Sequence, residues 1–332
     1  MSTIREVAEL AGVSQATVSR VMSGEVPVTE STRQRVESAM QALDYAPNAF
    51  ARSLASNRSQ GVGLMISHLG GPFMGRMMVT LEDRLRAYDK SLLVASGRSD
   101  PERERETVRF LLARRCDGML LHADGMGDDE LAALAERLPV VILNRLVPRL
   151  AEQCVHIDNV AGGYQATRHL IGHGHRAIAC ITGPLWKQDA TQRLMGYRRA
   201  MAEAHLAVDS DCVIEGDSTE AGGRRAVDRL EARGVACTAV VAGNDEMAVG
   251  AMARLRELGR RIPGDISVIG YDDEAYAHHL TPGLTTIHAP IEEMAEAAAA
   301  RLLELTYELP WQGPLVFRPW LVERGTVAGR RD

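Results

Sequence analysis

The chain has 332 residues, which is enough for more than one domain, and its 45% hydrophobic and 25% charged residues are typical of a soluble globular protein. No apolar run approaches the ~18 residues of a membrane-spanning helix, and the amino terminus lacks a signal-peptide core, so we expect neither a membrane protein nor an exported one. The five scattered cysteines favour free thiols in a reducing cytoplasm over disulfides or structural zinc, and the net charge of −6 disfavours binding to polyanions through bulk charge.

The first predicted element is a short helix, because apolar residues recur there at helical spacing: Ile4, Val7, Ala8 and Ala11. Thr3 and Glu6 have the spacing of a capping box at its start. Gly12 suits a tight turn with positive φ, and Ser14 can cap a second helix. Two short helices that cross at a glycine turn form a helix-turn-helix, whose second helix has the size to enter a DNA major groove. An ordinary helical hairpin fits the same pattern.

A third predicted helix begins at Thr29 and closes a small core, and the segment PNAFARSLAS follows it. With these residues the chain resembles the lactose-repressor family of bacterial transcription regulators: VAELAGVS-ATVSRV is similar to its DNA-binding headpiece and PNAFARSLAS to its hinge helix. The resemblance implies that Leu54 wedges a base step in the minor groove when paired hinge helices fold on DNA; a core leucine is the alternative. It also implies a set of operator contacts: Ser14, Gln15, Ala16, Thr17, Ser19, Arg20, Asn48 and Leu54.

The chemistry of the second helix is consistent with base recognition. The Gln15 amide can bond adenine, the Ala16 methyl can contact thymine, and Arg20 can contact guanine or clamp a phosphate. Residues 1–60 carry six arginines and six acidic residues, so their net charge is zero. Attraction to phosphate must then come from placed arginines, from amides at helix starts and from duplication in a dimer.

From Gly61 onward, short apolar runs alternate with charged helical patterns, which predicts parallel sheets covered by helices. The predicted strands are Val62–Ile66, Ser91–Ala95, Gly118–His122, Val140–Leu143, Val155–Ile157, Ala177–Ile181, Val213–Glu215, Ala239–Ala242 and Ser267–Tyr271. The fold class is therefore an all-α helix-turn-helix headpiece followed by an α/β core of two doubly wound lobes. The resemblance implies a periplasmic-binding-protein-like core, with the chain crossing between lobes near Asp158, Thr286–Ala289 and Arg318–Trp320.

The predicted boundaries are residues 1–45 for the headpiece, 46–59 for the hinge, 60–157 with 290–318 for lobe 1, and 158–289 with 319–328 for lobe 2. No heptad-bearing tail follows Leu321–Arg324, the segment with which we expect lobe 2 to finish. We therefore expect a homodimer, not a dimer of dimers.

Polar side chains follow several predicted strands at their carboxyl ends, where ligands bind in open α/β sheets. Carboxylates, amides and a guanidinium near an apolar ring suit a sugar, whose hydroxyls need placed donors and acceptors. We expect Arg193 to open a helix after the Gly183-Pro184 turn. The resemblance places six residues at effector-contacting positions: Phe73, Asn144, Asp189, Arg193, Asn244 and Asp272. Ser218 stands where the lactose repressor has a stacking tryptophan, which argues against a galactoside-like pocket floor.

Three further segments resemble the galactose repressor and isorepressor branch of the family: Arg115-Cys116, Leu143–Pro148, and Gln153-Cys154 with Asp158-Asn159. This similarity supports a hexose-type effector without identifying galactose.

Other classes of protein fit less well. Adjacent Asp272-Asp273 lacks the separate second carboxylate of a glycosidase, and no nucleophile elbow or phosphate loop occurs. His169, His173 and His175 suggest metal ligands, but no neighbouring cysteine or carboxylate completes a site, so we expect no metal and no cofactor. A sugar-binding transport protein would have a signal peptide and would lack residues 1–59. We therefore expect a dimeric cytoplasmic repressor that binds palindromic double-stranded operator DNA and responds allosterically to a sugar or sugar derivative.

Overall fold

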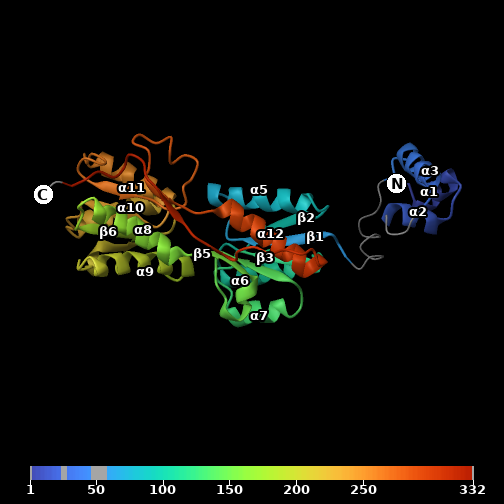
Figure 1. Cartoon of the computed structure of the whole chain (residues 1–332), viewed down its shortest axis with the longest axis horizontal. Coiled ribbons are helices and arrows are strands. Elements are labelled where there is room, and N and C mark those ends of the chain that lie inside the picture. The colour runs from blue at the N-terminus through green and yellow to red at the C-terminus, as the bar shows by residue number, and fades with distance from the viewer. Residues whose placement is uncertain (1, 24–27, 46–57, 331–332) are drawn as a thin grey trace. The chain divides into compact units, whose positions relative to one another are not determined.

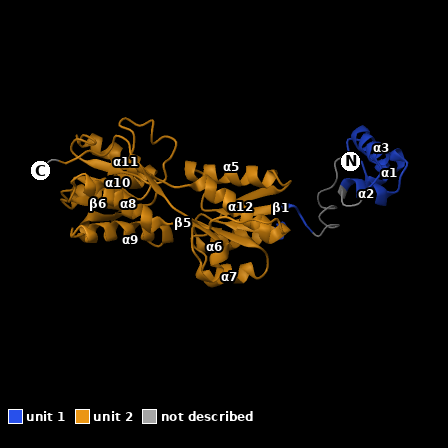
Figure 2. Ribbon diagram, in the orientation of Figure 1, with its two compact units in different colours: residues 1–61, 112–117 blue, residues 62–111, 118–332 orange. Residues whose placement is uncertain are grey.

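The computed structural model describes residues 2–23, 28–45 and 58–330 (Figure 1). Figure 2 shows two compact units, one of residues 1–61 with 112–117 and the other of residues 62–111 with 118–332. Most of the predicted hinge, including Asn48 and Leu54, lies outside the described residues. None of the described helices is long and apolar enough to span a membrane.

The first unit contains the three predicted helices, α1 (Ile4–Ala11), α2 (Gln15–Ser23) and α3 (Glu30–Ala42). The capping box of Thr3 and Glu6 is confirmed, and Gly12 follows α1 with a φ of 64°. The Ser14 hydroxyl accepts a hydrogen bond from the Thr17 amide at 3.1 Å, which confirms the predicted cap of α2. Buried apolar side chains join the three helices: Val7, Ala8, Ala11, Val18, Val36 and Ala39.

Lobe 1 of the second unit contains a sheet with the strand order β11-β5-β4-β3-β1-β2. Its strands are β1 (Gly61–Ile66), β2 (Ser91–Ser96), β3 (Gly118–Leu121), β4 (Val140–Leu143), β5 (Cys154–Ile157) and β11 (Val316–Phe317). The helices α5 (Pro72–Arg86) and α12 (Ile291–Tyr307) lie on one side, and α6 (Pro101–Ala113) and α7 (Asp128–Ala135) lie on the other (Figure 1). The central strands read as nearly continuous apolar runs because helices bury both faces of a parallel sheet.

Lobe 2 contains a parallel sheet with the order β7-β6-β8-β9. Its strands are β6 (Ile178–Thr182), β7 (Val213–Glu215), β8 (Ala239–Ala242) and β9 (Ser267–Ile269). Its helices pack as two pairs, α8 (Asn159–Gly172) with α9 (Gln188–Glu203) and α10 (Glu220–Ala232) with α11 (Asp245–Glu257). Short 3-10 helices precede two strands, at Pro148–Gln153 and Ser210–Cys212.

The chain passes between the two sheets at three places. It leaves β5 and enters α8 at Asp158, and it passes from β10 (Thr286–His288) to α12 and from β11 to β12 (Trp320–Val322). The strands β10 and β12 form an antiparallel pair in which Ile287 lies opposite Leu321. The crossings therefore lie side by side, where they can act as a common pivot for the lobes.

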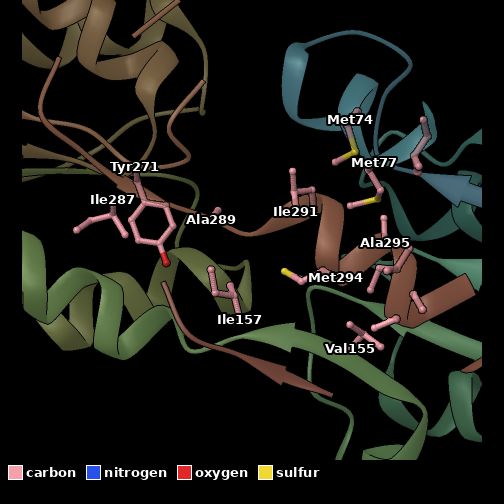
Figure 3. Close-up of a cluster of buried hydrophobic side chains, with 14 of the residues drawn as sticks. Met74, Met77, Val155, Ile157, Tyr271, Ile287, Ala289, Ile291, Met294 and Ala295 are labelled. Atoms are coloured by element: carbon pink, nitrogen blue, oxygen red, sulfur yellow. The ribbon is translucent and has the colours of Figure 1, made fainter. Parts of the chain in front are cut away.

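One hydrophobic core runs through these crossings. Tyr271, Ile287 and Ala289 continue into Ile291 and Met74 without a break between lobes (Figure 3). Because the two lobes share this core, packed apolar side chains at the crossings close one side of their cleft.

Candidate functional site

A cleft of about 130 Å³ opens between the lobes at the carboxyl ends of the strands. All six residues predicted to contact an effector line it: Phe73, Asn144, Asp189, Arg193, Asn244 and Asp272. They come from both lobes, with Phe73 at the start of α5, Asn144 directly after β4, and the others on lobe 2. One detail of the prediction is wrong. The helix α9 begins at Gln188, so Arg193 lies in its second turn and does not open it.

Arg193 is held rigidly on the lobe 2 side of the cleft. Its Nε donates to Asn159 Oδ1 at 2.9 Å, and its Nη1 donates to the Gly243 carbonyl. The guanidinium lies 3.7 Å from the ring centroid of Tyr271, whose hydroxyl also donates to Asn159 Oδ1. These contacts use Nε, Nη1 and one face of the guanidinium. The Nη2 edge lies toward Asp189, at 3.7 Å from its carboxylate.

Asp272 lies 3.7 Å from Arg193 and has an unusual backbone, with a φ of 110°. Its amide donates to the Ile287 carbonyl at 2.8 Å, which holds this strained turn against β10. Burial raises the pKa of Asp272 well above its ordinary value, and the charge of Arg193 opposes the rise. Asp272 Oδ1 is buried and accepts no hydrogen bond from the described residues. A ligand that donates a hydrogen bond would satisfy this oxygen.

The two asparagines of the cleft differ in what they offer a ligand. Asn144 adopts a left-handed backbone with a φ of 57°, and its buried Oδ1 has no hydrogen-bond donor among the described residues. Asn244 is already engaged, because its Oδ1 caps α11 at the Met247 amide and its Nδ2 donates to the Ser218 carbonyl. Asn144 can therefore accept a hydrogen bond from a ligand, whereas Asn244 joins the start of α11 to the Ser218 backbone.

Sequence reasoning missed several residues of the cleft, including His68, His122, Lys187 and Glu274. The carboxyl-end rule could have found His68 and His122, since each follows a lobe 1 strand within two residues. Burial lowers the pKa of His68, and the charges of Lys187 and His122 lower it further. Glu274 lies 3.6 Å from the guanidinium of Arg76, a residue of α5.

Polar contacts tie the lobes together beside the cleft. Lys187 Nζ of lobe 2 donates to Asp124 Oδ2 at 2.8 Å and to Ser99 Oγ at 3.1 Å, both in lobe 1. The Gln188 side chain accepts from the Leu146 amide and donates to the Leu146 carbonyl. Burial raises the pKa of Asp124, but the charges of His122 and Lys187 outweigh it, so the pKa is lowered. Asp124 is therefore ionised and holds Lys187 across the cleft.

A larger hollow of about 720 Å³ opens at the opposite edge of the lobe 2 sheet, near Thr238 and Ile266 at the strand starts. The cleft is the better candidate. It contains buried polar atoms without hydrogen-bond partners, at His122, Asn144, Asp272 and Glu274, whereas the hollow contains none among the described residues. Such atoms, gathered in one cleft, are suited to bind a polar ligand.

The helix α2 presents one exposed face in the first unit. Gln15, Ala16, Ser19 and Arg20 are exposed, whereas Val18 is buried against α1 and α3. Ser14 and Thr17 lie at the amino-terminal end of this face, joined by the capping hydrogen bond. The structure therefore brings six of the eight predicted DNA-contacting residues together on one helix end.

The reason for expecting no metal near the histidines is partly wrong. His175 is engaged, because its ring nitrogens bond Thr238 Oγ1 and the Ala328 carbonyl. His169 and His173, however, lie beside Glu323, a carboxylate from the far end of the sequence. Spacing along the chain gave no sign of this neighbour.

Comparison with known proteins agrees with this architecture. Residues 3–48 match the bacterial regulatory proteins of the lacI family, and residues 167–327 match the periplasmic binding protein-like domain. The HTH-type transcriptional regulator GalR of Salmonella typhimurium is 40% identical, covering 100% of this chain and 98% of its own. The HTH-type transcriptional regulator GalR of Escherichia coli is 39% identical, with coverages of 99% and 96%.

Solved structures agree over nearly the full length. The lac repressor dimer bound to operator and the anti-inducer ONPF has a TM-score of 0.88 and 30% identity, covering 98% of this chain and 99% of its own. The complex of the transcriptional regulator CelR with cellobiose has a TM-score of 0.72 and 33% identity, with coverages of 98% and 100%. Since sequence and structure match from the headpiece through the core, the chain belongs to the lacI family of bacterial regulatory proteins, and it is a DNA-binding transcriptional regulator, not an enzyme.

Proposed function

We propose that this regulator is a homodimeric cytoplasmic repressor that binds a palindromic operator and responds to a sugar or sugar derivative in the interlobe cleft. The observation that carries the proposal is the set of buried acceptors facing that cleft beside a fixed guanidinium. Asn144 Oδ1 of lobe 1 and Asp272 Oδ1 of lobe 2 accept no hydrogen bond from the described residues, and the Arg193 guanidinium lies 3.7 Å from Asp272. Sugar hydroxyls donate and accept at adjacent carbons, so they match this mixture.

The shape of the cleft supports the same ligand class. Phe73 provides an apolar surface at its lobe 1 side, among polar side chains that come from both lobes. A pyranose has both an apolar face of C–H groups and a rim of hydroxyls, so it can use both sides. Cellobiose in CelR and ribose in another family member from Enterococcus faecium are ligands of related folds. Similarity to GalR and GalS favours a hexose.

The proposed DNA contacts are the exposed face of α2 in two copies. Gln15 and Ala16 are proposed to contact base edges, Arg20 a guanine, and Ser14, Thr17 and Ser19 the neighbouring backbone. Asn48 and Leu54 complete the proposed set from the hinge, outside the described residues. The operator-bound lac repressor dimer supports a two-fold arrangement.

Lobe closure is the proposed link between the two sites. The Lys187–Asp124 and Gln188–Leu146 contacts form only when the lobes approach, and a ligand in the cleft changes the same approach. DNA and effector must then alter each other's affinity by the same factor, because coupling between binding sites is reciprocal.

The proposal is tested by titrating the full chain with a panel of monosaccharides and sugar derivatives, followed by calorimetry on any that raise its melting temperature. Asp272→Asn should lower effector affinity by about ten- to a hundredfold, because it replaces an acceptor oxygen by a donor nitrogen, and a buried polar group left without its partner costs roughly 1–3 kcal/mol. Operator affinity without effector should change little. Asp265→Asn is the matched control, since this carboxylate pairs with Arg261 on the lobe 2 surface.

Two outcomes contradict the proposal. Normal effector affinity in Asp272→Asn, together with a lower melting temperature, would mean that Asp272 only supports its turn. A panel in which no sugar binds would exclude the sugar class itself.

A further inference from the structure

Two histidines and a glutamate gather on lobe 2, away from the cleft. His169 lies in the last turn of α8 and His173 caps its carboxyl end, four residues later, so the two side chains share one face of the helix. Glu323 directly follows β12. One nitrogen from each ring and one oxygen of the carboxylate all lie within 4.8 Å of one another, and the ring centroids are 4.4 Å apart.

The hydrogen bonds of the two rings leave nitrogen lone pairs available. His173 Nδ1 lies 2.9 Å from the His169 carbonyl, so Nδ1 carries the proton and Nε2 has a free lone pair. Metal-binding histidines are commonly oriented in this way, through a ring N–H that donates to a backbone carbonyl. His169 Nε2 is buried and has no hydrogen-bond partner in the described part of the chain.

Glu323 lacks the contacts that would explain its position in another way. Its side chain is exposed, and among the described residues it forms no ion pair within 4.0 Å and no hydrogen bond. The neighbouring Arg324, by contrast, is bound to Asp273 at 2.6 Å and points away into the crossing. A carboxylate that has no ion pair among the described residues, beside two imidazoles, presents three ligand atoms to a metal ion.

We propose that His169, His173 and Glu323 bind a divalent transition-metal ion of the zinc class, with water at the fourth position. Two imidazoles and a carboxylate are a known ligand set for zinc. Donors at about 2.0–2.1 Å from a tetrahedral ion lie roughly 3.4 Å apart. The three ligand atoms lie within 4.8 Å of one another, so the widest separation must close by at most about 1.4 Å. The exposed Glu323 side chain can make that movement without displacing the backbone.

Such an ion would connect the end of α8 to the strand that follows the third crossing. α8 packs against α9, which carries Arg193, and β12 pairs with β10 at the pivot of the lobes. The bound ion would therefore stabilise lobe 2 against unfolding by mass action.

The test is a Zn²⁺ titration of the EDTA-treated, dialysed full chain by calorimetry and by thermal shift. We expect one ion per chain and a rise in melting temperature. Glu323→Gln and His173→Ala should each weaken Zn²⁺ binding at least tenfold, whereas His279→Ala, an exposed histidine elsewhere on lobe 2, should not. The Glu323→Gln change is on an exposed side chain, so it also serves if His173→Ala disturbs the fold.

Co²⁺ replaces Zn²⁺ in a second measurement that separates this site from the free cysteines. The visible d–d bands should show nitrogen and oxygen ligation, and the near-ultraviolet region should show no sulfur-to-cobalt charge-transfer band. The proposal is overturned if no ion binds, if a sulfur band appears at one equivalent, or if both ligand variants bind as the unaltered protein does.

Discussion

At the scale of the residue, Asp245 is a buried carboxyl group near the cleft whose pKa affects the stability of the fold. The side chain is completely buried, accepts from Thr286 Oγ1 at 2.6 Å and accepts from the Glu274 amide at 2.8 Å. Burial raises its pKa from 3.8 to about 7, the two hydrogen bonds oppose the rise, and Glu274 and Asp273 add to it. The folded protein therefore holds a proton here that the unfolded chain has released.

This proton makes stability depend on pH in a defined direction. Between about pH 4 and pH 7 the folded state binds more protons at Asp245 than the unfolded state, so its contribution to the free energy of unfolding falls as pH rises. Asp245→Asn should remove that slope, at about 1.4 kcal/mol for each unit of pKa difference. Urea unfolding at pH 5, 6 and 7 measures it.

Asp265→Asn is the control for the pH experiment. The hydrogen bonds from Arg261 lower the pKa of Asp265 to about 2, so its contribution is constant between pH 5 and pH 7. Parallel pH profiles for the unaltered protein and Asp245→Asn would contradict the raised pKa.

At the scale of the element, the amino-terminal ends of helices show why the sequence does not distinguish a residue that contacts the effector from one that caps a helix. Asn244 caps α11, Asp158 caps α8 and Thr219 caps α10, all at the carboxyl edge of the lobe 2 sheet or the crossing that leads to it. A helix that follows a strand begins at the same edge where ligands bind. One polar residue there can therefore serve either role, and only its hydrogen bonds separate them.

The cap of α2 provides a prediction for the DNA-binding unit. Ser14→Ala should remove the bond to the Thr17 amide, destabilise α2 by about 1 kcal/mol and weaken operator binding. Ser14→Asn should restore both, because asparagine caps helices as well as serine does. Hydrogen exchange of the α2 amides and fluorescence anisotropy with labelled operator measure the two effects.

The asparagine variant decides between two roles of Ser14. If its helix is protected from exchange but its operator binding stays weak, the serine hydroxyl is needed at the DNA and not only at the cap.

At the scale of the whole core, two kinds of contact join the lobes: a hydrophobic core that runs through the crossings, and polar contacts beside the cleft. The apolar core runs through the crossings, so the lobes cannot separate completely without exposing it (Figure 3). The Lys187–Asp124 ion pair, by contrast, lies beside the cleft and can break without disturbing the core. We therefore expect movement of the lobes to break the Lys187–Asp124 contact and to leave the shared hydrophobic core intact.

Asp124→Asn should favour the open arrangement, because it removes the negative charge that holds Lys187. Effector affinity should fall about threefold to thirtyfold, equivalent to about 0.7–2 kcal/mol. Asp124 is not part of the cleft lining, so the loss would act through closure. Asp129→Asn is the matched control, since it removes an exposed ion pair with Arg149 inside lobe 1. Calorimetry with the effector measures both.

A double-mutant cycle with Lys187→Met completes this experiment. If the two side chains act as one contact, the double variant should bind little worse than either single one. Additive losses, or a lower melting temperature with unchanged effector affinity, would contradict a closing role for the ion pair.

The sequence by itself determined most of the elements and some of their ends, although it placed the start of α9 five residues too late. Val140–Leu143, Val213–Glu215 and Ala239–Ala242 are strands at the residues predicted, because an apolar run between turn signals is a local property. The caps at Thr3 and Ser14 are equally local, since donor and acceptor are three residues apart.

Only the tertiary structure decided which side chains meet. Lys187 and Asp124 are 63 residues apart, and no periodicity relates them. Glu323 reaches His169 only because β12 returns to lobe 2 beside α8. The sequence placed polar residues at strand ends, but it left open that Asn244 is engaged as a cap while Asn144 keeps a free acceptor. Elements arise from interactions between neighbours along the chain, whereas a site arises from the packing of elements, which depends on the whole buried surface at once.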